Sequence, residues 1–173
     1  MSISTNSILV PIDGTEQTVI ALNQSYKIAQ HTDAKIILLS VEEEAQSSSV
    51  QRKLAELAKE AAAKSGQPVE TMLRQGNVYE EINKVSDVLE PLVMVGLTSK
   101  FSPGTFIGRN AFRMVRESKS PVMTIRGKYN SNAYKTILLP LDLTKESREK
   151  VDKAIVLAKR FNSTVRVVSV LSQ

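Results

Sequence analysis

Short apolar runs alternate with longer amphipathic stretches along most of this chain, and this alternation limits the possible folds more than any other feature. Residues 7–12, 35–41, 69–74, 92–95 and 122–125 have the length and composition of buried strands. Between them lie four stretches whose apolar residues recur at helical spacing. Strict alternation predicts a parallel sheet, because parallel strands need a long crossover that a helix provides.

The predicted fold class is therefore α/β: an open five-stranded parallel sheet with helices on both faces. In the strand order 3-2-1-4-5, the order reverses between the first and fourth strands. Ligands of such sheets bind beyond the carboxyl ends of the strands at this reversal. Two features of the sequence lie at those ends: Pro11, Ile12, Asp13 and Gly14 at the end of the first strand, and the loop from Gly96 to Gly108 after the fourth.

The opening of the chain recurs near its end. Residues 8–41 and 137–170 align without a gap at an offset of 129, and eight of the 34 positions are identical. The identical residues include Pro11 and Asp13, which recur as Pro140 and Asp142. The repeat predicts three parts, namely a complete domain over 1–127, a linker over 128–135 and a partial second repeat over 136–173.

The partial repeat is expected to form a strand, a helix and a second strand. The apolar side of its helix is expected to hold Val151, Ala154, Ile155, Leu157 and Ala158. Two strands and one helix cannot cover a sheet that needs helices on both faces. We therefore expect residues 136–170 to pack against another surface, either the first domain or the same segment of a second chain.

Composition excludes several kinds of chemistry. The chain has no cysteine, which removes disulfides, thiolate metal sites and thiol nucleophiles, and its single histidine, His31, leaves no histidine pair for a metal. The N-terminus lacks the basic and apolar regions of a signal peptide. The longest apolar runs fall far short of the ~20 residues that span a bilayer. These features predict a soluble, cytoplasmic protein without a membrane partner.

The net charge of +5 belongs to the end of the chain. Residues 1–127 hold 14 basic and 14 acidic side chains, whereas residues 128–173 hold 9 basic and 4 acidic ones. A nucleic-acid binder usually has a basic face on its folded domain. The balanced domain therefore argues against a nucleic-acid partner.

The residues at the expected ligand edge allow both functional and structural interpretations. The carboxylate of Asp13 can accept hydrogen bonds from a ribose or a base, or it can cap the following helix. The loop from Gly96 to Gly108 has three glycines and leads into a helix, an arrangement that suits a phosphate. The chain has neither a GxGxxG dinucleotide fingerprint nor a Walker lysine motif.

These motifs together resemble the universal stress protein family of the UspA type. The resemblance rests on ILVPIDGTE, DAKIILLSV, PLVMVG and GRNAFRMVRESKSPVMTI; it covers residues 7–126 and restarts at 136. The partial repeat resembles a tandem-type member whose second domain is cut short. The resemblance implies an adenine-nucleotide alpha-hydrolase-like fold and a homodimer formed through the last strand, Val122 to Ile125. Pairing of the tails over 136–170 is a second route to a homodimer.

In nucleotide-binding members of that family, the first-strand Asp and the end of the second strand hold adenosine, and the glycine loop holds the phosphates. That loop reads Gly, two residues, Gly, nine residues, Gly and then Ser or Thr. This sequence departs from the pattern, because Ser99 stands at the second glycine, only eight residues separate Ser99 from Gly108, and Arg109, followed by Asn110, replaces the hydroxyl residue. The planar guanidinium of Arg109 suits a phosphate, and a solvent-facing arginine is the alternative. The nucleotide-binding residues implied are Pro11, Ile12, Asp13, Val41, Gly96, Thr98, Ser99, Gly108, Arg109 and Asn110.

The function predicted is a stress-response signalling domain that binds ATP or another adenine nucleotide, with Mg²⁺, and has no strong catalysis. No general base beyond Asp13 is evident, so ATP hydrolysis is expected to be weak at most. The alternative is an interaction module of the same fold that has lost nucleotide binding, as the altered loop permits. A related ATP-dependent enzyme would carry an SGGxDS-like loop after the first strand, where this chain reads DGTEQT.

Overall fold

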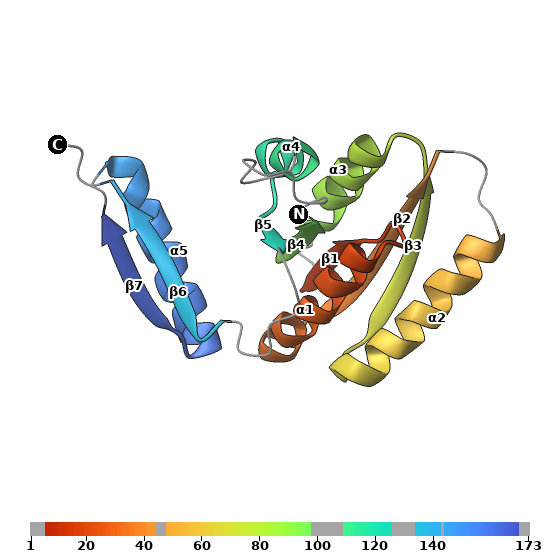
Figure 1. The fold of residues 1–173 in the computed structure, drawn as a ribbon, viewed down its shortest axis with the longest axis horizontal. Coiled ribbons are helices and arrows are strands. Elements are labelled where there is room, and N and C mark those ends of the chain that lie inside the picture. The colour runs from red at the N-terminus through yellow and green to blue at the C-terminus, as the bar shows by residue number, and fades with distance from the viewer. Residues whose placement is uncertain (1–5, 44–47, 98–108, 126–133, 143, 170–173) are drawn as a thin grey trace. The chain divides into compact units, whose positions relative to one another are not determined.

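The chain folds into two compact units, Met1–Tyr129 and Asn130–Gln173, which we call unit 1 and unit 2 (Figure 1). The computed structural model describes residues 6–43, 48–97, 109–125, 134–142 and 144–169. Within these ranges, every helix is too short or too polar to span a bilayer.

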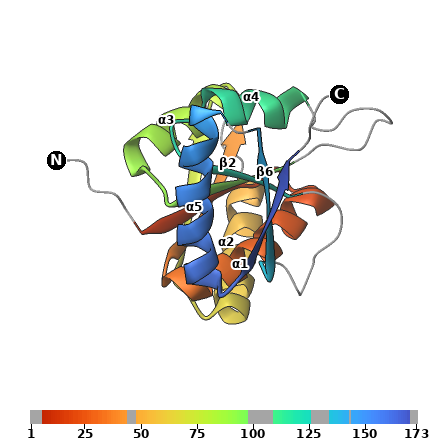
Figure 2. The same cartoon turned by 90° about the vertical axis from the view of Figure 1, so that its left-hand side faces the viewer.

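Unit 1 is the predicted alternating domain. Its elements are β1 Ser7–Pro11, α1 Glu16–Thr32, β2 Lys35–Glu42, α2 Ser48–Ser65, β3 Val69–Gln75, α3 Val78–Leu89, β4 Val93–Leu97, α4 Arg109–Glu117 and β5 Val122–Ile125. The strands pair in parallel in the order β3-β2-β1-β4-β5. Figure 2 shows α3 and α4 on one side of this sheet and α1 and α2 on the other. The predicted fold class and strand order are confirmed.

The centre of unit 1 is the strand β1. Residues Ser7, Ile8, Leu9 and Val10 are fully buried, because β1 has a strand on each side and helices over both faces. Successive side chains of a strand point to opposite faces of a sheet. The α3 and α4 face is filled by one cluster, namely Leu9, Ile37, Leu39, Ile82, Val85 and Met94, with Met114 and Val122 packed against it.

The edges of the sheet are β3 and β5. The assignment of Val122–Ile125 to an edge strand is confirmed, and all four of its residues are half-buried. The amide of Met94 donates to the carbonyl of Pro121 over 2.8 Å. Backbone groups alternate in direction along a strand, so Val122 and Thr124 direct theirs away from β4, towards the open edge.

Unit 2 repeats the first three elements of unit 1. It consists of β6 Thr136–Leu141, α5 Lys145–Phe161 and β7 Thr164–Ser169, with β6 and β7 paired in parallel (Figure 2). Its register also repeats that of unit 1, because Leu138 pairs with Arg166 as Leu9 pairs with Ile37. Both helices end on a residue with left-handed backbone geometry, Asp33 in α1 and Asn162 in α5.

The apolar side of α5 is covered only in part. Ala154 and Phe161 are its buried apolar residues, and the ring of Phe161 stacks on Tyr134 with 4.9 Å between centroids. Ile155 and Leu157, which the sequence assigned to the apolar side, are exposed. The sheet under α5 has only two strands, which are too narrow to cover both flanks of a helix.

A pair of substitutions in α3 tests the cluster on the α3 and α4 face. Ile82 is 3% exposed and lies inside the cluster, whereas Val88 on the same helix is 80% exposed. We expect Ile82→Ala to lower the free energy of unfolding by about 2–5 kcal/mol in urea denaturation, because it leaves a cavity. The control Val88→Ala should change it by less than about 0.5 kcal/mol. Equal effects of the two substitutions would contradict this packing.

Candidate functional site

Three neighbouring strands end together at the carboxyl edge of unit 1. Pro11 in β1 pairs with Leu39 in β2, so Asp13 follows the end of β1 at the same edge where β2 continues through Val41. Leu9 pairs with Met94, which brings Gly96 of β4 level with Pro11. The structure thus brings Pro11, Ile12, Asp13, Val41 and Gly96 to one edge, where the strand order reverses.

The turn after β1 leaves Asp13 exposed. Its Oδ1 accepts hydrogen bonds from the backbone N–H of Thr15 at 2.9 Å and from the Thr15 hydroxyl at 2.7 Å. Gly14 between them has a φ of +78°, which favours glycine. Thr15 is the N-cap residue of α1, but its side chain makes no capping hydrogen bond, and its hydroxyl donates to Asp13. Among the described residues nothing donates to the Oδ2 atom of Asp13, so that oxygen can accept from a ligand.

The apolar residues beside Asp13, Ile12 and Val41, are fixed in position by hydrogen bonding and packing. Ile12 is buried, and its amide donates to the carbonyl of Leu39 over 2.7 Å. Val41 is half-buried and packs against the cluster on the α3 and α4 face. At the end of β2, the Glu42 carbonyl accepts from the Gly76 amide at 2.9 Å. The edge therefore combines one exposed carboxylate with apolar walls fixed by the sheet.

The structure describes only some of the residues that were predicted to bind the phosphates of a nucleotide. Arg109 and Asn110 are the first two residues of α4, the helix that contacts β4 and β5. The N-terminus of a helix carries a partial positive charge that favours anions. Thr98, Ser99 and Gly108 lie outside the described residues.

One contact at this edge was not predicted from the sequence. The guanidinium of Arg113 in α4 lies over the ring of Tyr79 in α3, 5.0 Å from its centroid, and its Nε donates to Glu117 Oε1 at 3.0 Å. Burial raises the pKa of the Tyr79 hydroxyl. The contact joins the first turn of α3 to α4. No local pattern could reveal it, because the two residues are far apart in sequence.

The duplicated aspartate in unit 2 has a different environment. Asp142 Oδ1 accepts from the Thr144 hydroxyl at 2.7 Å, from the Thr144 amide at 3.2 Å and also from the Ser147 hydroxyl. At the position in unit 1 that corresponds to Ser147, the Thr18 hydroxyl donates to the carbonyl of Thr15 instead. The hydrogen bonds, that of Ser147 first, hold the pKa of Asp142 well below its usual range. The two copies of the turn are therefore not equivalent as ligand sites.

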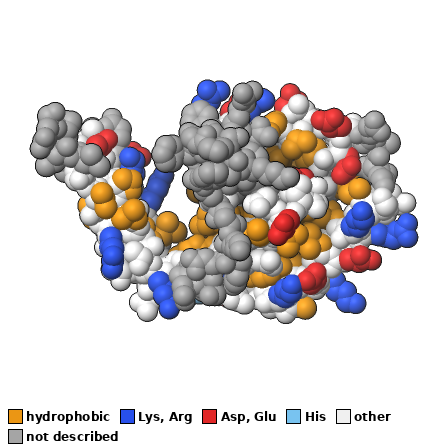
Figure 3. Space-filling view, in the orientation of Figure 1, with side chains coloured by type: hydrophobic (Ala, Val, Ile, Leu, Met, Phe, Trp, Pro, Cys, Tyr) orange, Lys and Arg blue, Asp and Glu red, His pale blue; other side chains and the backbone are white. Residues whose placement is uncertain are grey.

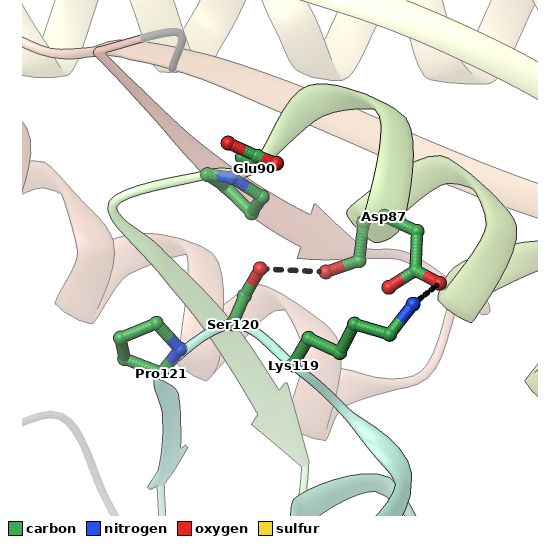
Figure 4. Close-up of a pocket in the computed structure, with 7 residues that line it drawn as sticks. Asp87, Glu90, Lys119, Ser120 and Pro121 are labelled. Carbon is green, nitrogen blue, oxygen red and sulfur yellow. Dashed lines mark hydrogen bonds and ion pairs between the residues drawn. The ribbon is translucent and has the colours of Figure 1, made fainter. Parts of the chain in front are cut away.

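A pocket of about 280 Å³ lies away from this edge, between the end of α3 and the start of β5 (Figure 4). Its charged and hydroxyl groups already bond one another: Lys119 Nζ lies 2.7 Å from Asp87 Oδ2, and Ser86 Oγ lies 3.0 Å from Ser120 Oγ. These pairs connect the end of α3 to the segment that enters β5. We interpret the pocket as part of the structural contact between α3 and the start of β5, not as a ligand site.

The fold is that of a doubly wound parallel α/β domain, and this edge lies at the reversal of strand order, where sheets of this kind bind their ligands. The family model described as the universal stress protein family matches residues 5–126. The chain belongs to the universal stress protein family. A search of curated proteins found no match.

Solved structures of similar fold include several universal stress proteins. One from Archaeoglobus fulgidus DSM 4304 is 19% identical with a TM-score of 0.79, and the match covers 98% of this chain and 68% of that one. A putative universal stress protein from Pseudomonas aeruginosa UCBPP-PA14 is 20% identical with a TM-score of 0.71, covering 95% and 61%. This chain thus spans roughly two thirds of the length of these two relatives.

A third neighbour was solved with a nucleotide. It is a universal stress protein in complex with cAMP, 18% identical with a TM-score of 0.60, and the match covers 71% of this chain and 98% of that one. At these identities the likeness establishes the fold alone.

The hydrogen bonds to Asp142 predict how unit 2 responds to acid. Because the pKa of Asp142 is lowered in the folded state, its contribution to stability is present above the unfolded-state pKa of about 3.9 and is lost as the pH falls through the folded value. We expect carboxyl NMR signals to show Asp142 still ionised at about pH 3. Ser147→Ala should raise this pKa towards its ordinary value. An ordinary pKa for Asp142 in the unmodified chain would contradict the assignment.

Proposed function

We propose that unit 1 binds an adenine nucleotide at the carboxyl edge of β1, β2 and β4 and acts as a stress-response signalling domain without strong catalysis. The observation that carries this proposal is the exposed Asp13 carboxylate at the reversal of strand order, at the same edge of the sheet as Val41 and Gly96. The neighbour solved with cAMP supports an adenine nucleotide as the class of ligand.

Each part of the edge has a proposed role. Asp13 Oδ2 accepts hydrogen bonds from the ribose hydroxyls, while Oδ1 remains engaged with Thr15. The apolar walls at Ile12 and Val41 take the adenine ring. The start of α4, with Arg109 and Asn110, faces the phosphates together with Thr98, Ser99 and Gly108 of the glycine loop.

The proposal has no strong catalytic step. Among the described residues, no group of three or more His, Asp or Glu side chains is arranged to hold a metal ion. In this proposal Mg²⁺ arrives with the phosphates of ATP. Asp13 is the one carboxylate proposed to face the ligand, and it holds the ribose, so ATP hydrolysis is weak at most.

Binding by an Asp13→Asn variant tests the site. The change removes the charge and keeps the size of the side chain, so it should weaken ATP and adenosine alike by about 1.5–3 kcal/mol, the contribution of a charged hydrogen bond. Isothermal titration calorimetry with ATP, ADP, AMP, cAMP and adenosine measures the loss and identifies the preferred nucleotide.

The matched control for that experiment is Asp142→Asn, because Asp142 sits in the same turn of unit 2 with its Oδ1 engaged three times. This variant should bind nucleotide as the unmodified chain does. If the unmodified chain binds none of these ligands at millimolar concentration, the alternative holds: an interaction module of the same fold that has lost nucleotide binding.

We also propose that the chain forms a homodimer through the open edge of β5. The outward backbone groups of Val122 and Thr124 can continue the sheet into a second copy. Thr124→Pro removes an outward N–H and spares the bonds to β4, so it should convert a dimer to a monomer in multi-angle light scattering. Thr124→Val keeps the N–H and should leave the dimer intact. An unchanged mass for Thr124→Pro would place the interface elsewhere, including on the tail over 136–170.

A further inference from the structure

β3 forms the edge of the sheet of unit 1 opposite β5. The seven residues of this strand, Val69–Gln75, pair with β2 on one side. Before β3 starts, the Ile36 amide donates to the Pro68 carbonyl over 2.9 Å, and after it ends, the Gly76 amide donates to β2 over 2.9 Å. Even-numbered residues of β3 therefore direct their backbone groups to β2. The odd-numbered residues direct theirs away from the sheet, namely Val69, Thr71, Leu73 and Gln75.

One side of β3 carries a charge of each sign. Glu70, Met72 and Arg74 share the α3 and α4 face, because alternate residues of a strand point the same way and Met72 packs against the cluster on that face. Glu70 Oε1 lies 2.9 Å from Lys35 Nζ, and the Glu70 side chain is 57% exposed. Arg74 is also exposed and has no ion-pair partner among the described residues. Figure 3 shows acidic and basic side chains together on the side of unit 1 where α2 and β3 lie.

The order of these charges makes the edge complementary to itself. When two copies of β3 pair antiparallel about Met72, Glu70 of each copy lies opposite Arg74 of the other. The same register overlaps the whole strand and places Thr71 opposite Leu73, so the outward N–H and C=O groups bond each other. A shift by two residues keeps such backbone bonds but separates both pairs of charges. Charge and backbone therefore select one register.

The helix beside β3 leaves room for a second copy. Burial, together with the nearby Glu60 carboxylate, raises the pKa of Tyr26 in α1 to about 12, so Glu60 marks the side of α2 that faces α1. The opposite side of α2, towards the edge of the sheet, carries the small side chains of Ala55 and Ala62. Packed helices lie about 8–10 Å apart, depending on the side chains between them. Two α2 helices can therefore lie side by side across the joined strands.

We propose that unit 1 associates with a second copy of this chain through β3, with the two strands antiparallel about Met72 and two ion pairs between Glu70 and Arg74. The Glu70 carboxylate serves both Lys35 of its own chain and Arg74 of the second copy, because a carboxylate has about four acceptor sites. The interface is small, so the association is expected to be weak. The proposal depends neither on nucleotide binding nor on the edge of β5.

A cysteine at the centre of β3 tests the register, since the chain has no cysteine of its own. In the proposed pairing Met72 lies opposite Met72 of the second copy, with Cα atoms about 4.5 Å apart, a distance that suits a disulfide. Met72→Cys should therefore give a disulfide-linked dimer of the full chain under mild oxidation, measured by non-reducing electrophoresis. The matched control is Thr71→Cys. Thr71 is more exposed than Met72 but lies opposite Leu73, so this variant should cross-link about tenfold more slowly.

Charge reversal tests the ion pairs. In the Met72→Cys chain, either Glu70→Arg or Arg74→Glu places like charges opposite each other, and each should slow cross-linking about tenfold. An equal mixture of these two chains should recover the rate, because opposite charges then face each other at both pairs, and mass spectrometry should identify the product as the heterodimer. The control Lys53→Glu, on the exposed surface of α2, makes the same change in charge as Arg74→Glu and should leave the rate unchanged.

Three results would overturn the proposal. The first is cross-linking of Thr71→Cys as fast as that of Met72→Cys, which means that exposure alone governs the reaction. The second is no dimer from Met72→Cys, as when unit 2 or another segment of the chain covers β3. The third is a mixture of the charge-reversed chains that cross-links no faster than either alone. If Met72→Cys fails to fold, sedimentation velocity of the two charge-reversed chains with Met72 retained, alone and mixed, decides by the same criterion.

Discussion

The architecture of unit 1 depends on the burial of β1. This strand pairs with β2 on one side and β4 on the other, and Ser7 to Val10 are completely removed from solvent. Consecutive parallel strands cannot be connected by hairpins, so the chain must pass from one to the next by helical crossovers over the faces of the sheet. The crossover through α1 leads to β2, and β4 reaches the other side of β1 through α3. The reversal of strand order, and the position of Asp13 beside it, follow from this arrangement.

The need to cover both faces of a parallel sheet also explains the exposed surface of unit 2. β6 repeats the β1 pattern, and its Leu139, covered by α5, is buried as its counterpart Val10 is. Leu138 points to the other face, which no element within the described part of unit 2 covers. Burying a leucine contributes about 1.5–3 kcal/mol, so each such exposed residue favours an additional contact. The duplication thus yields both a faithful strand–helix–strand unit and an apolar face.

Much of this could be predicted from the sequence because strand and helix periodicities are local. The run from Ser7 to Ile12 and the helical stripes predicted the alternation of strands and helices, and the order 3-2-1-4-5 assumed for such a sheet places β5 at its edge. The Arg113 and Tyr79 contact could not be predicted, since it depends on how two helices cross. The exposure of Ile155 and Leu157 could not be read from the sequence either, because an apolar stripe indicates a face to be covered but not the width of the sheet beneath it. At the candidate site, the sequence identified Asp13 and Val41 but not the hydrogen bonds that occupy one oxygen of Asp13.

The two aspartates show how a duplicated motif changes its role through one neighbour. Asp13 and Asp142 end equivalent strands and accept the same two hydrogen bonds from the threonine two residues later. A hydroxyl in the first turn of the helix makes the difference: Ser147 donates to Asp142, whereas Thr18 bonds the carbonyl of Thr15. The methyl group of threonine restricts its χ1 rotation, and within a helix its hydroxyl often bonds a carbonyl of the preceding turn. The side chain at this one position therefore determines whether Oδ1 of the carboxylate accepts two hydrogen bonds or three.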